Sequence, residues 1–176
     1  MTLILSKKYN PLFESDARYF IITGGRGSGK SFAVTVFLTL LTMSRGIRVL
    51  FTRYTMTSAH LSIIPEFLEK IGLLGFDEVF SINKQEVLNT KNNSDILFRG
   101  IRTSAGNQTA SLKSLQGIST WVLDEAEELV DENIFDTIDL SIREKKVQNR
   151  IILVLNPVTK EHWIYKRFFE DKGIEG

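Results

Sequence analysis

The 176-residue sequence contains no cysteine, which excludes disulfide bonds and thiolate metal sites and agrees with a reducing compartment. It contains no run of about 18 apolar residues and no apolar signal core near its start, so neither a transmembrane helix nor a signal peptide is predicted. A formal net charge of +1 gives no overall attraction to nucleic acid, so any basic surface must be local. We therefore expect a soluble intracellular protein, whose 43% hydrophobic content suffices for one domain over residues 1–176.

The chain does contain an alternation of short and long apolar segments, interrupted by only three prolines. Short runs bounded by glycine or polar residues predict strands, and longer runs predict helices. We expect strands at 18–23 and 47–52 and within the runs 120–129 and 150–157, helices at 30–45, 58–73 and 160–172, and three short antiparallel strands within 76–101. The helix at 58–73 should begin or break near Pro65. This order predicts an α/β fold with a mostly parallel central sheet flanked by helices.

The stretch "IITGGRGSGKSFAV" at 21–34 contains a phosphate-binding motif. Its pattern, G-x-x-x-x-G-K-[ST], lies between a predicted strand and a predicted helix, as this loop requires. Glycines let backbone N–H groups turn toward phosphate oxygens, and the helix N-terminus adds partial positive charge. Lys30 is expected to reach the β- and γ-phosphates, and the Ser31 hydroxyl to ligate Mg²⁺. The predicted nucleotide-binding residues are Gly24, Gly25, Arg26, Gly27, Ser28, Gly29, Lys30 and Ser31.

A second motif, "WVLDEAEE", places Asp124 and Glu125 side by side just past a predicted strand. Adjacent residues on an extended chain point in opposite directions. Asp124 can therefore face Mg²⁺ while Glu125 faces a water beside the γ-phosphate as a general base. The alternative is that these acids merely cap a strand and open a helix. The distance from Lys30 along the chain leaves room for inserted strands, which suits ATPases with a glutamate at the strand end (the ASCE class) better than nucleotide kinases or small GTPases.

The third feature is Asn156, which ends the apolar run "RIILVLN" directly before Pro157. An amide at the tip of a buried strand can contact the γ-phosphate or the attacking water and so respond to hydrolysis. The alternative is an ordinary Asn-Pro turn at the end of a strand. The sequence alone leaves both interpretations open.

Together these motifs resemble the large terminase subunits of tailed double-stranded DNA phages. The resemblance rests on "GGRGSGKS", "SLKSLQGISTWVLDEAEEL", "LSIRE" and "ILVLNP", in that order, and extends from about residue 10 to residue 168. It implies a P-loop ATPase of the ASCE type that uses ATP and Mg²⁺ to drive double-stranded DNA into a procapsid. The implied partners are a portal protein, a small terminase subunit and further copies in a ring, with a monomer expected in isolation and the host cytoplasm as location.

The resemblance also implies roles for individual residues. Arg26 matches the arginine of the phosphate loop, which is proposed to sense or stabilise the γ-phosphate. Asp124 matches the metal-binding aspartate, Glu125 the catalytic glutamate, and Asn156 falls in the coupling motif. The segment Tyr9, Asn10 and Pro11 falls where the family contacts adenine. Apart from the resemblance, an arginine finger acting on a neighbouring subunit could lie among Arg53, Arg99, Arg102, Lys113 and Arg143, although most charged residues are simply solvated.

The family usually continues into a nuclease domain that cuts concatemeric DNA, and nothing after Asn156 resembles its cluster of metal-binding acids. We therefore expect a truncated ATPase domain without nuclease activity. Two other functions fit the same phosphate motifs. One is another nucleic-acid translocase or helicase-like ATPase, and the other is a nucleotide-binding assembly switch with negligible turnover. DNA-stimulated hydrolysis with strand separation would favour the first.

Overall fold

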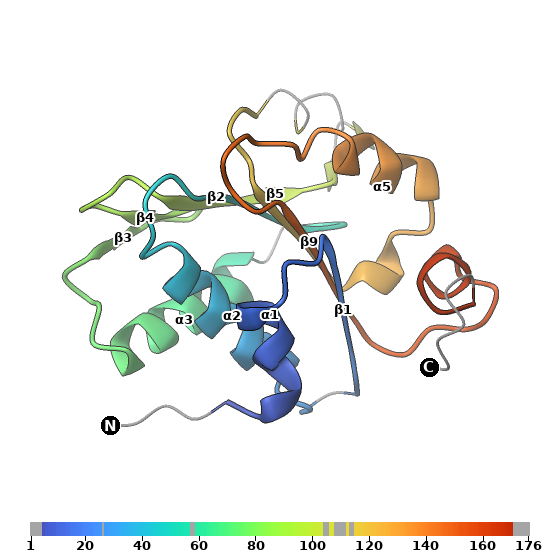
Figure 1. Cartoon of the computed structure of the whole chain (residues 1–176), viewed down its shortest axis with the longest axis horizontal. Coiled ribbons are helices and arrows are strands. Elements are labelled where there is room, and N and C mark those ends of the chain that lie inside the picture. Colours follow the sequence, from blue (N-terminus) through green and yellow to red (C-terminus); the bar gives the residue numbers. More distant parts are fainter. Residues whose placement is uncertain are drawn as a thin grey trace.

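The computed structural model describes residues 5–25, 27–56, 59–103, 106–107, 112 and 115–170. Strands and helices alternate toward both ends of the chain, with a run of strands between them (Figure 1). The elements are η1 (Lys7–Tyr9), α1 (Asn10–Glu14), β1 (Tyr19–Thr23), α2 (Lys30–Leu41), β2 (Arg48–Arg53), α3 (Ala59–Leu73), β3 (Phe80–Ile82), β4 (Glu86–Asn89), β5 (Asp95–Gly100), β6 (Arg102–Thr103), β7 (Gly106–Asn107), β8 (Thr120–Asp124), η2 (Ala126–Glu128), α5 (Glu132–Asp139), β9 (Arg150–Leu155) and η3 (Tyr165–Glu170).

Seven strands form one sheet in the order β1-β9-β8-β2-β5-β4-β3. The pairs β1–β9, β9–β8, β8–β2 and β2–β5 are parallel, whereas β4 runs antiparallel to both β3 and β5. The mostly parallel sheet and the antiparallel excursion are thereby confirmed. Strand β9 lies between β1 and β8 and runs parallel to both. The carboxyl ends of these three strands therefore lie together at one end of the sheet, where open α/β sheets bind ligands.

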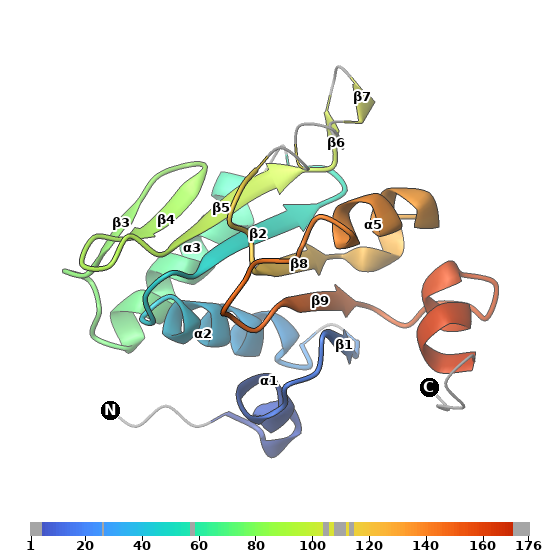
Figure 2. The ribbon, with the colours of Figure 1, turned by 45° about the horizontal axis from the view of Figure 1, so that its top comes forward.

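Helices cover both faces of the sheet (Figure 2). α1, α2 and α3 pack on one face, and α5 with the C-terminal segment packs on the other. Neighbouring residues of a strand alternate between the two cores. Val49 and Phe51 of β2 join the α2 side, and Leu50 between them joins the α5 side. Among the described residues, no helix has the length and apolarity needed to cross a membrane.

Helix α2 ends at Leu41, four residues before the predicted end at Arg45. The side-chain amides of Asn89 and Asn92 donate to the carbonyl oxygen of Thr42, at 3.0 and 3.2 Å. The two side chains thus take the place of the backbone N–H group that would donate to this carbonyl if the helix continued for another turn. The partners are distant in sequence, so the chain pattern could not indicate this end point.

Helix α3 runs without a break through Pro65, so the predicted interruption is wrong. A proline inside a helix frees a carbonyl one turn earlier. Pro65 is exposed, and Ile63, Ile64, Phe67 and Ile71 are buried on the other side. Water can hydrogen-bond to the carbonyl that Pro65 leaves without a helical partner, because carbonyls on the exposed side of a helix tilt toward solvent. Burial of the apolar face maintains the helix.

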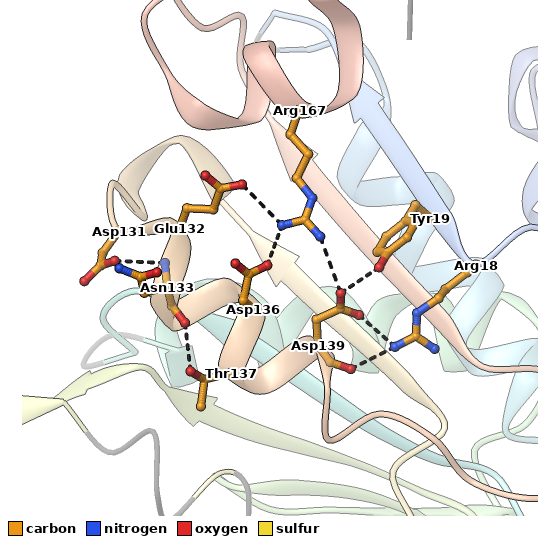
Figure 3. Close-up of polar contacts among 9 residues, drawn as sticks. All are labelled: Arg18, Tyr19, Asp131, Glu132, Asn133, Asp136, Thr137, Asp139 and Arg167. Carbon is orange, nitrogen blue, oxygen red and sulfur yellow. Dashed lines mark hydrogen bonds and ion pairs between the residues drawn. The ribbon is translucent and has the colours of Figure 1, made fainter. Parts of the chain in front are cut away.

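Helix α5 is fastened to β1 and η3 by the buried carboxylate of Asp139 (Figure 3). Arg18 donates to Asp139 Oδ1 at 2.7 Å and the hydroxyl of Tyr19 donates to Oδ2 at 2.6 Å. Arg167 donates to Asp136 at 2.5 Å and lies 3.7 Å from Asp139 Oδ2. Burial and the bond to Asp139 raise the pKa of Tyr19. This network holds the C-terminal segment against the sheet.

The helix expected at 160–172 is found in part. Its described portion contains the π-helical turns of η3, which begin at Tyr165. Trp163, Ile164 and Phe168 are buried while Lys166 is exposed. One side of the segment therefore packs into the hydrophobic core on the sheet face that α5 covers. Residues 171 and 172 lie outside the described residues. Trp163 and Phe168 therefore serve packing.

Candidate nucleotide-binding site

A cavity of about 530 Å³ opens at the carboxyl ends of β1, β8 and β9. Its walls include Gly25, Gly27, Ser28, Gly29, Lys30 and Ser31 of the glycine-rich loop. Asp124, Glu125 and Asn156 line it from the other two strands, and so do Arg53, Glu66 and Glu127. Three sequence motifs that are far apart in the chain therefore converge on one site. Arg26 lies outside the described residues.

The conformation of the loop depends on its glycines, Gly24 and Gly29 among them. Gly24 has φ +152°, and a Cβ there would lie 2.8 Å from Ser28 Oγ. Gly29 immediately precedes α2 in the left-handed region, with φ 84°. L-residues with side chains disfavour such conformations. These glycines let the chain reverse from β1 into α2 and expose backbone N–H groups at the helix N-terminus, the arrangement that binds anions.

Lys30, the first residue of α2, lies folded back over the loop. Its Nζ donates to the carbonyl oxygens of Gly24 and, at 3.0 Å, Gly25. It also lies within hydrogen-bond distance, 3.4 Å, of Asn156 Oδ1. The lysine thus spans from the loop on β1 to the end of β9.

Ser31 donates its hydroxyl hydrogen bond to Glu66 of α3. Glu66 also accepts from Thr35 at 3.5 Å. The predicted magnesium ligand is therefore joined to a carboxylate that sequence analysis did not select. Glu66 carries no signal of its own in the sequence, because its position beside α2 depends on how the two helices pack.

Asp124 forms a close ion pair with Arg53, with 2.8 Å between Oδ2 and Nε. The two side chains are only 17% and 19% exposed. Strands β2 and β8 are parallel neighbours with Thr52 opposite Leu123, so the next residues fall side by side. Burial raises the pKa of Asp124, and the charge of Arg53 opposes that rise without cancelling it. Arg53, a finger candidate in the sequence, contacts a carboxylate of its own chain.

Glu125 has a different environment from its neighbour. Its side chain is 53% exposed, and its Oε1 lies 4.0 Å from Arg53 Nη1. Its backbone is in the left-handed region, with φ 50°. Non-glycine residues rarely adopt this conformation, and such strain concentrates at functional sites. The turn directs an accessible carboxylate to the cavity while Asp124 stays buried.

Asn156 connects two parts of the site. Its Nδ2 donates to Glu127 Oε1 at 3.0 Å, and its Oδ1 faces Lys30. An ordinary Asn-Pro turn would not require either contact, so the functional interpretation gains support. Glu127 was not predicted as a site residue, although "DEAEE" places it two residues beyond Glu125.

The family described as "Phage terminase large subunit" matches residues 16–175 of this chain. The chain belongs to this family. The large terminase subunit of Bacillus phage SPP1 is 24% identical over 184 residues, which cover 93% of this chain and 42% of that protein. This terminase chain thus spans less than half the length of that curated relative.

Solved terminase structures share its fold. The large terminase from a thermophilic bacteriophage has a TM-score of 0.75 at 12% identity, covering 97% of this chain and 43% of that one. Complexes of that same terminase with ADP and with ATP-gamma-S have TM-scores of 0.70 and 0.66 at 13% and 14% identity, each covering 95% of this chain and 42% and 41% of theirs. The bacteriophage Phi-29 viral genome packaging motor assembly has a TM-score of 0.68 at 15% identity, covering 97% and 51%. The predicted ASCE-type P-loop fold is confirmed.

The remaining predicted residues of this terminase chain lie in different places. Tyr9, in the segment expected to contact adenine, donates its hydroxyl to Ser28 O at 3.1 Å. Tyr9 and Pro11 line a second cavity of about 280 Å³. Arg102 and Arg143 are exposed, whereas Arg99 donates to main-chain oxygens of Gln85 and Phe98. Lys113 lies outside the described residues.

Proposed function

We propose that this chain is the ATPase domain of a phage DNA-packaging motor. It couples hydrolysis of ATP to translocation of double-stranded DNA into the procapsid. The observation that carries this proposal is the convergence of Lys30, the pair Asp124–Glu125 and Asn156 on one cavity. The proteins that share its fold, which include ADP and ATP-gamma-S complexes and a genome packaging motor, support it.

The residues at the site fit Mg²⁺. Ser31 offers a hydroxyl and Asp124 a carboxylate, and magnesium prefers such oxygen ligands. Within the described residues, no three or more His, Cys, Asp or Glu side chains form a metal-holding group. Magnesium usually takes one or two protein carboxylates and completes its shell with waters and substrate phosphates. When bound, it would neutralise charge that develops on the phosphates.

The chain's own residues supply binding and proton transfer. Lys30 exchanges the carbonyl oxygens of Gly24 and Gly25 for phosphate oxygens, which are stronger partners because they are charged. The exposed carboxylate of Glu125 accepts the proton of the attacking water. Asp124, held by Arg53, stays oriented at the end of β8. Asn156 lies beside Lys30, where the hydrogen of Nδ2 that Glu127 does not accept can donate to the γ-phosphate.

The internal contacts also support a nucleotide-binding switch as a second function of the isolated chain. Lys30, Ser31 and Asp124 are all engaged with protein groups. The contacts of Lys30 and Ser31 must be exchanged before MgATP is fully bound, so we infer slow turnover until partners join. In the motor these partners are double-stranded DNA, the portal protein, the small terminase subunit and further copies of the chain in a ring. The motor acts in the host cytoplasm, and we assign no nuclease activity to this chain.

Ligand-induced stabilisation tests the proposal. A ligand that binds only the folded state stabilises it by RT ln(1 + [L]/Kd), or about 2.7 kcal/mol at a hundredfold excess over Kd. We expect MgATP to raise the melting temperature of the parent and to leave that of Lys30→Ala unchanged. The exposed Arg143→Ala variant serves as the control and should shift like the parent. Equal stabilisation of Lys30→Ala would show that the loop does not bind phosphate.

A further inference from the structure

The structure assigns Glu127 as a positioning residue that fixes the amide of Asn156 for recognition of the terminal phosphate. This inference rests on the proposed function, because it concerns the same ATP site. Glu127 follows the acidic pair by two residues, lies in η2 and lines the cavity. Its position raises a physical question, since a carboxylate beside a phosphate site repels the ligand.

The two partners of Asn156 answer that question. A lysine ammonium can only donate hydrogen bonds, and an ionised carboxylate can only accept them. The amide oxygen of Asn156 must therefore face Lys30 and its Nδ2 must face Glu127, as observed at 3.4 and 3.0 Å. An asparagine without such partners can turn its amide over at little cost. Glu127 removes that freedom.

The hydrogen bond from Asn156 is the main polar contact of the Glu127 carboxylate. Oε2 is buried without a hydrogen-bond partner in the described part of the chain. Buried polar atoms are normally paired, and an unpaired one calls for a functional explanation. Asn156 Nδ2 is thus the side-chain donor to this carboxylate among the described residues. Each of the two groups depends on the other.

The backbone of Glu127 is held separately from its side chain. The His162 ring lies 3.1 Å from the Glu127 carbonyl oxygen, and Trp163 Nε1 donates to Leu129 O at 2.7 Å. These contacts tie η2 to the segment after β9. Glu127 therefore keeps its place when ATP draws Lys30 away from Asn156. One hydrogen of Nδ2 then stays on Glu127, which leaves the second hydrogen to donate to the terminal phosphate and the amide oxygen to accept from the attacking water.

The test compares the affinities of ADP and ATP-gamma-S, which differ at the terminal phosphate. We expect Glu127→Ala to reduce the preference for ATP-gamma-S about tenfold, the effect of one charge-assisted hydrogen bond. ADP affinity should change by less than about twofold, which also reports that the variant is folded. Glu127→Gln, whose amide oxygen can still accept from Asn156, should recover most of the preference. Glu128→Ala is the matched control, because Glu128 is exposed on the same turn.

A double-mutant cycle separates positioning from independent binding. Once Asn156→Ala is present, adding Glu127→Ala should have no further effect on the nucleotide preference. Additive effects, an equal loss of ADP affinity in Glu127→Ala, or an unchanged preference would each overturn the inference while leaving the proposed function intact. A parent protein that binds neither nucleotide would overturn the proposed function, and the inference with it.

Discussion

Replacing Arg53 by methionine removes the cation that compensates the buried carboxylate of Asp124. Methionine keeps most of the apolar stem, so the change isolates the charge. At the observed 2.8 Å, an effective dielectric constant of about 20 gives an attraction of about 6 kcal/mol. Desolvation of both groups offsets much of that attraction. Breaking one side of a buried pair costs about 3 to 5 kcal/mol, and the partial exposure of both side chains favours about 3.

Chemical denaturation with urea at pH 7 measures this cost. We expect the free energy of unfolding of Arg53→Met to fall by about 3 kcal/mol. In an Asp124→Asn background the same substitution should cost less than about 1 kcal/mol, because no buried charge is left unpaired. Arg143→Ala, which removes an exposed arginine, should stay within about 0.5 kcal/mol of the parent.

The deficit should also depend on pH in a fixed direction. Burial already raises the folded-state pKa of Asp124 above its ordinary value, and loss of Arg53 raises it further. A carboxyl whose folded pKa is raised contributes stability that is fully present below the unfolded pKa of about 4. That contribution is lost as the pH rises through the folded pKa. The deficit of Arg53→Met should therefore shrink as the pH is lowered. A deficit that is independent of pH and equal in both backgrounds would refute the ion-pair explanation.

Two further predictions concern the phosphate loop and the Asp139 network. Gly24→Ala should lower the free energy of unfolding by about 1 to 3 kcal/mol, because its backbone would be strained, and it should abolish stabilisation by MgATP. The control is Gly25→Ala, whose added methyl group meets open space. It should lower the free energy of unfolding by less than about 0.5 kcal/mol without nucleotide. Tyr19→Phe should cost about 1.5 to 3 kcal/mol at pH 8 by urea denaturation, since it removes a hydrogen bond to a carboxylate. Because the folded pKa of Tyr19 is raised, its contribution is lost as the pH rises from about 10 through that pKa, so the two proteins should converge; a constant gap would contradict this.

Much of the site could be predicted from the sequence because its motifs are local. The loop containing Lys30 needs only its own glycines, a strand before it and a helix after it. Asp124 and Asn156 each end a continuous apolar run, and parallel strands bring such ends to one edge. The three strands could therefore be expected to share a site before their order in the sheet was known.

The contacts made by Arg53, Glu66 and Glu127 could not be predicted in the same way. Each depends on which elements become neighbours in space. Arg53 reaches Asp124 because β2 pairs with β8, and Glu66 reaches Ser31 because α3 packs beside α2. The continuous α3 was also missed, because the exposure of Pro65 is set by packing and not by local propensity. The sequence pattern predicts where strands and helices form, but it does not predict which of them become neighbours in the fold.

Separating binding from turnover in Glu125→Gln tests the central claim most directly. Glutamine keeps the size and hydrogen-bonding capacity of the side chain but cannot accept the proton of the attacking water. With concentrated protein, ATP affinity should stay within about twofold while single-turnover hydrolysis falls about 10²-fold or more. Asp124→Asn should instead weaken Mg²⁺-dependent binding, and the exposed control Glu128→Gln should match the parent in both. Hydrolysis at the parental rate in Glu125→Gln, or loss of binding in place of turnover, would contradict the assignment of this cavity as an ATPase site with Glu125 as its base.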